Sequence, residues 1–110
     1  MSEPQKLVVE DVTLDEVKQG LADGSIALID VREPNEWAAG HIKGATLNPL
    51  STFDAQALPT DKRVVFHCRS GKRTLQAIAL AQDAGRTDAR AHFSGSMNAW
   101  ERAGEPISHD

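Results

Sequence analysis

Two short and almost continuous apolar runs constrain the fold of this chain more than any other feature of its sequence. They cover Ile26–Val31 and Val64–His67, and both contain several β-branched residues. Runs of this kind are typical of strands that are buried on both faces, as in a parallel sheet. Because parallel strands are joined by right-handed crossovers, helices are expected on both sides of the sheet.

Helical patterns and weaker strand signals fill the chain around these two runs. Thr13 and Glu16 have the spacing of a capping box, which marks the start of a helix, and Gly24 is its expected end. Further helices are predicted from Pro34 to Gly40, from Leu75 to Gly85 and from a cap at Ser96 to Gly104. Further strands are predicted at 7–9, 45–48 and 89–93, and one or two helical turns within 50–58. The sequence therefore predicts a small three-layer, doubly wound α/β domain of about five mostly parallel strands with helices on both faces.

Length and composition limit what this domain can be. A chain of 110 residues has room for one hydrophobic core, so we place a single domain at residues 7–107, between flexible tails at 1–6 and 108–110. No apolar run approaches the roughly 20 residues that cross a bilayer, and the polar first residues do not resemble a secretion signal. The single cysteine, Cys68, excludes an internal disulfide. We therefore expect a cytoplasmic protein.

The charges of the chain are distributed unevenly. The formal net charge is −4, yet no carboxylate lies between Asp61 and Asp83. Five cations occupy that window: Lys62, Arg63, Arg69, Lys72 and Arg73. An otherwise acidic surface disfavours nucleic acids and anionic membranes as partners. The basic window is suited to one small anion, and an ordinary solvated surface is the alternative interpretation.

The loop Cys68–Arg73, between the second apolar run and the next helix, carries the candidate chemistry. Open α/β sheets bind ligands beyond the carboxyl ends of their strands, and a helix start favours negative charge because its amides are unpaired. Gly71 lets the backbone curl so that successive N–H groups can form an anion-binding nest. Such amides, together with nearby cations, lower the pKa of a thiol. Cys68 is therefore the candidate nucleophile, and we expect it to be accessible, whereas most lone cysteines are small buried apolar residues.

Three stretches of the chain resemble a single-domain rhodanese, a sulfurtransferase of the rhodanese homology family. They are Leu28–Trp37 with Gly40–Ala45, the loop Cys68–Arg73, and Gly95–Ser96 with Trp100, Ala103–Gly104 and Pro106. Their order along the chain makes the resemblance specific, and it extends over nearly the whole predicted domain. Ser96 departs from the pattern, because the family often has a second glycine there. We expect this departure to affect the approach to the last helix and to leave the chemistry of the loop unchanged.

The resemblance implies a doubly wound fold and a cysteine that carries sulfur. The Cys68 thiolate would attack the outer sulfur of a thiosulfate-like donor, sulfite would leave, and the persulfide formed would pass its sulfur to a thiol or to cyanide. The partners would be a small anionic sulfur donor and a thiol acceptor, either a small molecule or a protein. This chemistry requires no metal and no organic cofactor.

The other candidate site residues surround Cys68. The substrate-binding residues are expected in the rest of the loop: Arg69, Ser70, Gly71, Lys72 and Arg73. The three cations would attract and orient the anionic donor, while the other two residues contribute backbone amides. Asp30 and Arg32, at the end of the first apolar run, could support the pocket, but a buried ion pair that fixes the neighbouring loop is the favoured interpretation.

Two other functions stay open. The stretch His67–Gly71 resembles the start of the tyrosine-phosphatase signature, and some cell-cycle phosphatases share the rhodanese fold. That signature has five residues between cysteine and arginine, whereas four separate Cys68 from Arg73 here, and a tighter loop suits one sulfur atom better than a phosphoryl group. The second alternative is a non-catalytic module that binds a ligand or senses redox state through a low-pKa thiol.

Overall fold

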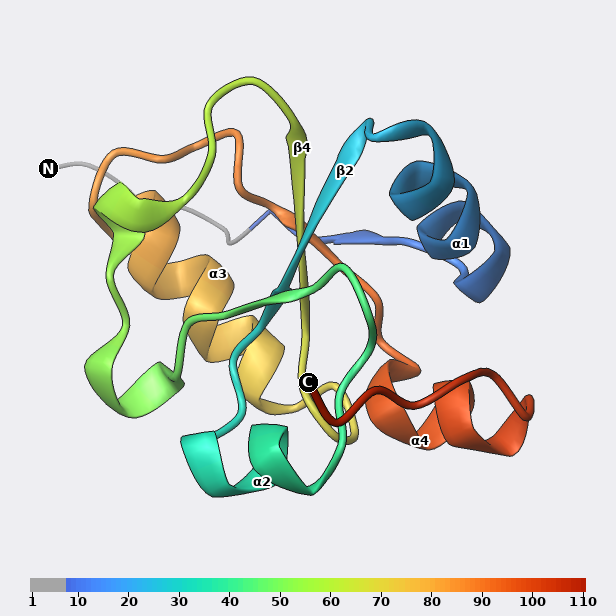
Figure 1. Ribbon diagram of the computed structural model, residues 1–110. Helices are drawn as coiled ribbons and strands as arrows, with labels where there is room; N and C mark the ends of the chain where they lie inside the picture. Colours follow the sequence, from blue (N-terminus) through green and yellow to red (C-terminus); the bar gives the residue numbers. More distant parts are fainter. Residues whose placement is uncertain (1–7) are drawn as a thin grey trace, which may run out of the picture.

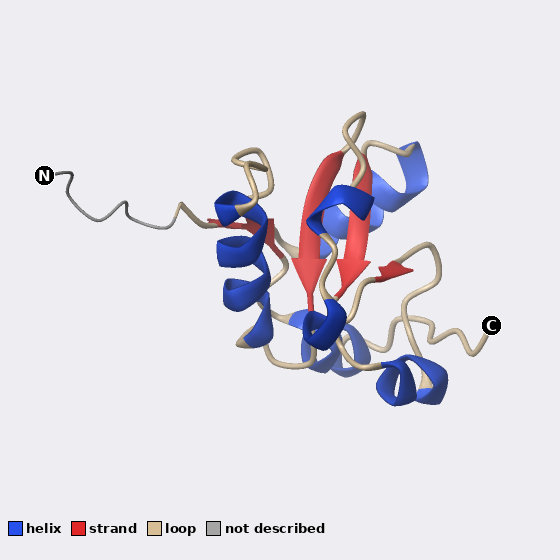
Figure 2. Cartoon of the chain, turned by 90° about the vertical axis from the view of Figure 1, so that its left-hand side faces the viewer, coloured by secondary structure: helices blue, strands red, loops and turns tan. Residues whose placement is uncertain are grey.

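Five parallel strands form one sheet in the order β1-β5-β4-β2-β3 in the computed structural model, which describes residues 8–110. The strands are β1 (Glu10–Asp11), β2 (Ile26–Asp30), β3 (Thr46–Leu47), β4 (Arg63–His67) and β5 (Ala91–His92). Strands β2 and β4 pair over their full length, and in Figure 2 they run side by side in the same direction. The predicted doubly wound parallel sheet is confirmed.

Helices cover both faces of this sheet, as predicted. They are α1 (Leu14–Asp23), α2 (Pro34–Ala39), α3 (Arg73–Asp83) and α4 (Ser96–Arg102), with 3₁₀ turns η1 (Leu50–Thr52) and η2 (Ala55–Ala57). The capping box of α1 is present, because the Thr13 hydroxyl accepts from Glu16 N–H and the Glu16 carboxylate accepts from Thr13 N–H, both at 3.1 Å. No helix within residues 8–110 has the length and apolar character needed to span a bilayer.

The hydrophobic core consists of two clusters, one on each face of the sheet. Val64 and Phe66 of β4 belong to the cluster that includes residues of α3, whereas Val65 belongs to the cluster that includes residues of α1 and α4. Figure 1 shows α3 on one side of β2 and β4, and α1 and α4 on the other. Each fully buried side chain of this size contributes about 1.5–3 kcal/mol, so β4, which has buried side chains in both clusters, is firmly anchored.

The position of the first predicted strand differs from the structure. The first strand lies at Glu10–Asp11, because backbone pairing with β5 begins at Glu10 and the apolar side chain that enters the core is Val12. Of the predicted strand 7–9, residues 8 and 9 are not in a strand, and residue 7 lies outside the described residues. Val8 and Val9 are 47% and 39% exposed.

The start of the last helix also differs, because Gly95 is the N-cap of α4 and Ser96 is its first residue.

Of the two predicted tails, only the C-terminal one lies within the described residues. Residues 1–6 lie outside the described residues. Ser108, which we place in the C-terminal tail, exchanges two backbone hydrogen bonds with His41, at 2.7 and 2.8 Å.

The strand ends determine where a ligand can bind. Strands β2 and β4 point toward the end of the molecule where α2, α4 and the start of α3 gather (Figures 1 and 2). The loop after β4 therefore lies among three helices.

Candidate active site

The loop after β4 curls around the sulfur atom of Cys68. Strand β4 ends at His67, and α3 begins at Arg73, so Arg73 is the first helical residue and not the end of the loop. The Gly71 N–H donates to Cys68 Sγ at 3.1 Å. Gly71 has φ of +89°, and a Cβ atom at this position would lie 2.4 Å from the Ser94 carbonyl oxygen. Only glycine fits there without moving the loop.

Backbone amides determine the ionisation of Cys68. Burial raises the pKa of the thiol, but hydrogen bonds from the backbone N–H groups of Thr74, Gly71, Ser70 and Arg73 outweigh this effect and lower the pKa below its ordinary value. The amides therefore favour the thiolate, which is the reactive form of cysteine.

The expected accessibility of Cys68 is wrong. The residue is only 1% exposed and packs with the hydrophobic cluster on the α3 side of the sheet. The reason is that the side chain packs against the α3 side of the sheet while the backbone N–H groups of residues 70–74 face the sulfur. The start of α4 holds the backbone of the cysteine, because Met97 N–H donates to the Cys68 carbonyl at 3.0 Å. A reactant therefore has to reach the sulfur past the rim of the loop, where Arg69, Ser70 and Lys72 are exposed.

Ser96 contacts the cysteine itself, so its position bears on more than the approach to the last helix. Its Oγ accepts a hydrogen bond from Cys68 N–H at 3.1 Å and lies 4.0 Å from Cys68 Sγ. The sequence contained a signal for this contact. A serine in place of a glycine in a tight turn adopts a backbone conformation unusual for serine, and its buried hydroxyl then needs hydrogen-bond partners.

Thr74 is a second residue that the sequence analysis did not assign to the site. Besides its N–H, which acts on the sulfur, its hydroxyl donates to the Gly71 carbonyl at 2.7 Å and lies 2.7 Å from His92 Nδ1. Thr74 therefore holds Gly71 from its carbonyl side while the Gly71 N–H faces the sulfur.

The three cations of the loop have different surroundings. The Arg73 guanidinium donates to both carboxylate oxygens of Glu36 in α2, at 2.7 and 3.0 Å, so its charge is largely balanced. Arg69 and Lys72 are exposed, and within residues 8–110 neither forms an ion pair. The cations available to a donor anion are therefore Arg69 and Lys72.

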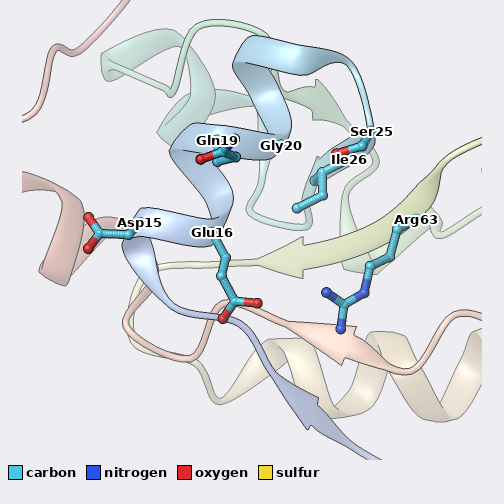
Figure 3. A pocket seen from close by; sticks show the side chains of 7 residues that line it. All are labelled: Asp15, Glu16, Gln19, Gly20, Ser25, Ile26 and Arg63. Atoms are coloured by element: carbon cyan, nitrogen blue, oxygen red, sulfur yellow. The ribbon is translucent and has the colours of Figure 1, made fainter.

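The five cations of the basic sequence window do not form one cluster. Arg63 is the first residue of β4 and Lys62 precedes it, at the opposite end of the strand from Cys68, and Arg63 pairs with Glu10 at 3.1 Å. Figure 3 shows Arg63 at a hollow of about 380 Å³ that is lined by α1 and the start of β2. That hollow is separated from the cysteine loop by the length of the strand.

The Glu36–Arg73 pair ties α2 to the start of α3 and should give the protein a measurable pH dependence. The hydrogen bond from Arg73 lowers the pKa of Glu36 from 4.5 to about 2. Because the folded-state pKa is the lower one, this stabilisation is present above about pH 4.5 and is lost as the pH falls toward 2.

Replacing Glu36 with glutamine tests this pair, because glutamine can still cap α2 at the same position. We expect Glu36→Gln to lower the free energy of unfolding at pH 7 by about 1–2 kcal/mol, a value reduced for solvent screening. Urea unfolding at pH 7, 5, 4 and 3 measures it. The difference between the free energies of unfolding of wild type and variant should fall by about half by pH 3. A difference that does not change with pH would show that the Glu36–Arg73 ion pair is not its cause.

Asp30 and Arg32 form the predicted buried ion pair. Arg32 Nη2 donates to Asp30 Oδ2 at 2.8 Å and to the Gly40 carbonyl at 2.8 Å, which fixes the segment after β2. His67 Nε2 is buried 3.6 Å from Asp30 Oδ2 without a hydrogen-bond partner. Burial lowers the pKa of His67, and the opposing effect of Asp30 does not offset it, so we treat His67 as neutral and Arg32 as the partner of Asp30.

A hollow of about 360 Å³ lies beside the loop, between α2, Arg32, Arg69 and Glu101. Its lining carries both signs of charge, which suits a polar reactant that approaches the rim of the loop. Within residues 8–110, the structure brings together no three His, Cys, Asp or Glu side chains in the arrangement of a metal site.

Residues 13–103 match the Rhodanese-like domain family. Human thiosulfate:glutathione sulfurtransferase is 38% identical over 105 residues, which cover 81% of this chain and 90% of that protein. A sulfurtransferase of Allochromatium vinosum is 35% identical over 105 residues, covering 91% and 95% of the two chains. The probable adenylyltransferase/sulfurtransferase MoeZ of Mycobacterium tuberculosis is 38% identical over 100 residues, covering 86% of this chain, but this chain spans about a quarter (25%) of its length.

Two solved structures match this chain over most of its length. Human single-domain sulfurtransferase TSTD1 superposes with a TM-score of 0.70 at 35% identity, covering 84% of this chain and 95% of that one. A rhodanese-related protein of Thermoplasma volcanium, at 21% identity, shares the fold with a TM-score of 0.76 over 91% of this chain and 98% of that one. The relatives named sulfurtransferases support a sulfurtransferase role in general. The family match and these relatives show that this chain belongs to the rhodanese-like domain family.

Proposed function

We propose that this protein transfers sulfur from a thiosulfate-like donor to a thiol or to cyanide through a persulfide on Cys68. The observation that carries this proposal is the convergence of backbone N–H groups on the Cys68 sulfur, which lowers the pKa of its thiol in spite of burial. Donors fixed in place before the reaction stabilise an anion without reorganisation.

The first half of the reaction loads the cysteine. The Cys68 thiolate uses an electron pair to bond to the outer sulfur of thiosulfate, the sulfur–sulfur bond of thiosulfate breaks, and sulfite leaves with that bonding pair. A Cys68 persulfide anion remains, and its outer sulfur carries the negative charge. Total charge is conserved, and no oxidant or reductant is consumed.

The second half returns the enzyme to its starting state. A thiolate or cyanide bonds to the outer sulfur, and the persulfide bond breaks with its electron pair on Cys68 Sγ. The products are a persulfide of the acceptor, or thiocyanate, and the Cys68 thiolate. The amides that hold the thiolate before loading receive it again after transfer, which is the pattern of a covalent, two-step enzyme.

The surroundings of the loop support an inorganic anionic donor. Arg69 and Lys72 are exposed at the rim and form no ion pair among the described residues, whereas Arg73 is held by Glu36. Because Cys68 is 1% exposed, a compact donor whose outer sulfur enters the loop ahead of its charged oxygens suits the site better than a bulky one. We propose that the acceptor approaches through the hollow beside Arg69.

Loading and transfer are tested separately. Wild-type protein mixed with thiosulfate should gain the mass of one sulfur atom, and cyanide added afterwards should remove it and release thiocyanate. The matched donor control is 3-mercaptopyruvate, an organic thiol, which we expect to load Cys68 at least about tenfold more slowly because it suits the cationic rim less well.

The possible outcomes distinguish the alternative functions. Hydrolysis of an aryl phosphate without thiocyanate formation would replace this proposal with a phosphatase. An alkylatable Cys68 that neither loads sulfur nor hydrolyses phosphate would indicate a binding or redox-sensing module.

A further inference from the structure

Ser96 has a backbone conformation that is unusual for serine. Its φ is +53°, and it is the one non-glycine residue with positive φ among residues 8–110. Its side chain is fully buried at the start of α4. Left-handed conformations of non-glycine residues persist where the surroundings hold them, and they occur often at functional sites. The contacts that hold Ser96 in this conformation therefore indicate what the residue does.

The Ser96 hydroxyl connects the end of β4 to the end of β5. It accepts from Cys68 N–H at 3.1 Å and donates to the Phe93 carbonyl at 2.9 Å. The next residue, Met97, donates its backbone N–H to the Cys68 carbonyl at 3.0 Å. The first two residues of α4 thus hold Cys68 by both its amide and its carbonyl, which fixes the direction in which its side chain leaves the backbone.

The single hydrogen of this hydroxyl has two acceptors within reach. Phe93 O is at 2.9 Å, and Cys68 Sγ is at 4.0 Å, the outer limit for a hydrogen bond to sulfur. With a neutral thiol, the carbonyl is the better acceptor. An anionic sulfur competes more strongly, because hydrogen bonds to charged acceptors are shorter and about twice as strong. The other donors to the sulfur come from residues 70–74, so this one approaches from a different element.

We propose that Ser96 is a positioning residue for sulfur transfer: its hydroxyl holds the amide of Cys68 and supplies the anionic sulfur with a hydrogen-bond donor from outside the loop. This inference rests on the proposed function, because the hydroxyl would donate its hydrogen bond to the thiolate and to the persulfide anion of that reaction. A glycine at this position would provide neither interaction and would leave the buried Cys68 N–H without this acceptor.

The test measures the thiolate directly, without sulfur transfer. The rate of Cys68 alkylation by iodoacetamide, followed by mass spectrometry from pH 5 to 10, gives the pH at which half of the thiol is ionised. We expect this midpoint to rise by about half to one pH unit in Ser96→Ala and in Ser96→Gly, which means three- to tenfold less thiolate below the midpoint. Thiosulfate:cyanide transfer, measured at a pH below the wild-type midpoint, should fall by a similar factor in kcat/KM.

The two variants and one control separate the hydroxyl from the backbone. Both variants lack the hydroxyl, but glycine tolerates positive φ, so Ser96→Gly should also melt at a higher temperature than Ser96→Ala. Ser94→Ala is the matched control, because the Ser94 hydroxyl donates to Asp11 at 2.9 Å, and its alkylation midpoint should equal that of wild type.

The proposal is overturned if both Ser96 variants titrate at the wild-type midpoint, even if they melt earlier. It is also overturned if only the alanine variant shifts, because the backbone and not the hydroxyl would then be responsible. Alkylation needs no sulfur donor. A wild-type protein that fails to transfer sulfur would therefore reject the proposed function, while the alkylation midpoints would still decide the role of Ser96 at the thiol.

Discussion

Replacing Cys68 with serine should reduce thiocyanate formation from thiosulfate and cyanide to the uncatalysed rate, a loss of at least about a thousandfold. A serine hydroxyl is not ionised at neutral pH, so it cannot attack the outer sulfur of the donor, and it cannot carry a transferable sulfur. Serine is close to cysteine in size, and the amides that face the sulfur can donate to its oxygen. The fold should therefore survive, with a melting temperature within a few degrees of wild type. Steady-state thiocyanate release and mass spectrometry after thiosulfate treatment measure the two consequences.

A chemical control is available because the chain has a single cysteine. Wild-type protein alkylated to completion with iodoacetamide should be as inactive as Cys68→Ser, and protein first loaded with thiosulfate should resist alkylation at Sγ. Transfer by Cys68→Ser within about tenfold of wild type would remove the cysteine from the mechanism. The persulfide route requires that Cys68→Ser stays folded, still binds thiosulfate and has lost sulfur transfer. The variant should also show no hydrolytic activity.

The fold was predictable because its signals are local. The apolar runs at Ile26–Val31 and Val64–His67 became the central pair β2 and β4, and the capping box at Thr13 formed as expected. The first strand was misplaced because an edge strand of two residues, Glu10–Asp11, is selected by pairing with β5 rather than by its own apolar character. Local composition could not reveal that Val12, and not Val8 or Val9, enters the core.

The site was predictable to the extent that it depends on the loop itself. The position of Cys68 after a strand and the nest formed around Gly71 follow from the order of residues. What the sequence could not show are contacts between distant segments: the Glu36 carboxylate that holds Arg73, the α4 residues that bond to the backbone of Cys68, and the core cluster that buries its side chain. The packing turns an expected exposed thiol into a buried one, and the Glu36 contact reduces the cations available to a donor from three to two.

Replacing Gly71 with alanine should damage the site more than any other single change in the loop apart from loss of the cysteine. The added Cβ would lie 2.4 Å from the Ser94 carbonyl oxygen, and backbone atoms cannot yield as a flexible side chain can. The loop must therefore shift, and the Gly71 N–H that donates to Cys68 Sγ at 3.1 Å moves with it. Loss of one preorganised donor to a developing anion costs about a hundredfold or more in rate. We expect thiosulfate:cyanide transfer to fall by about that factor and the alkylation midpoint of Cys68 to rise.

Gly85→Ala is the matched control for this variant. Gly85 also has positive φ, +95°, but a Cβ there meets nothing within 4 Å, and the residue follows α3 at the far end from Cys68. Both alanines therefore carry the strain of a left-handed conformation, which costs about 1–2 kcal/mol of stability, and only the one at position 71 also displaces the loop. Gly85→Ala should unfold at lower urea yet keep wild-type transfer and thiol titration. Equal losses of activity in the two variants would mean that stability governs transfer, and the amide of Gly71 would then have no special part in holding the sulfur.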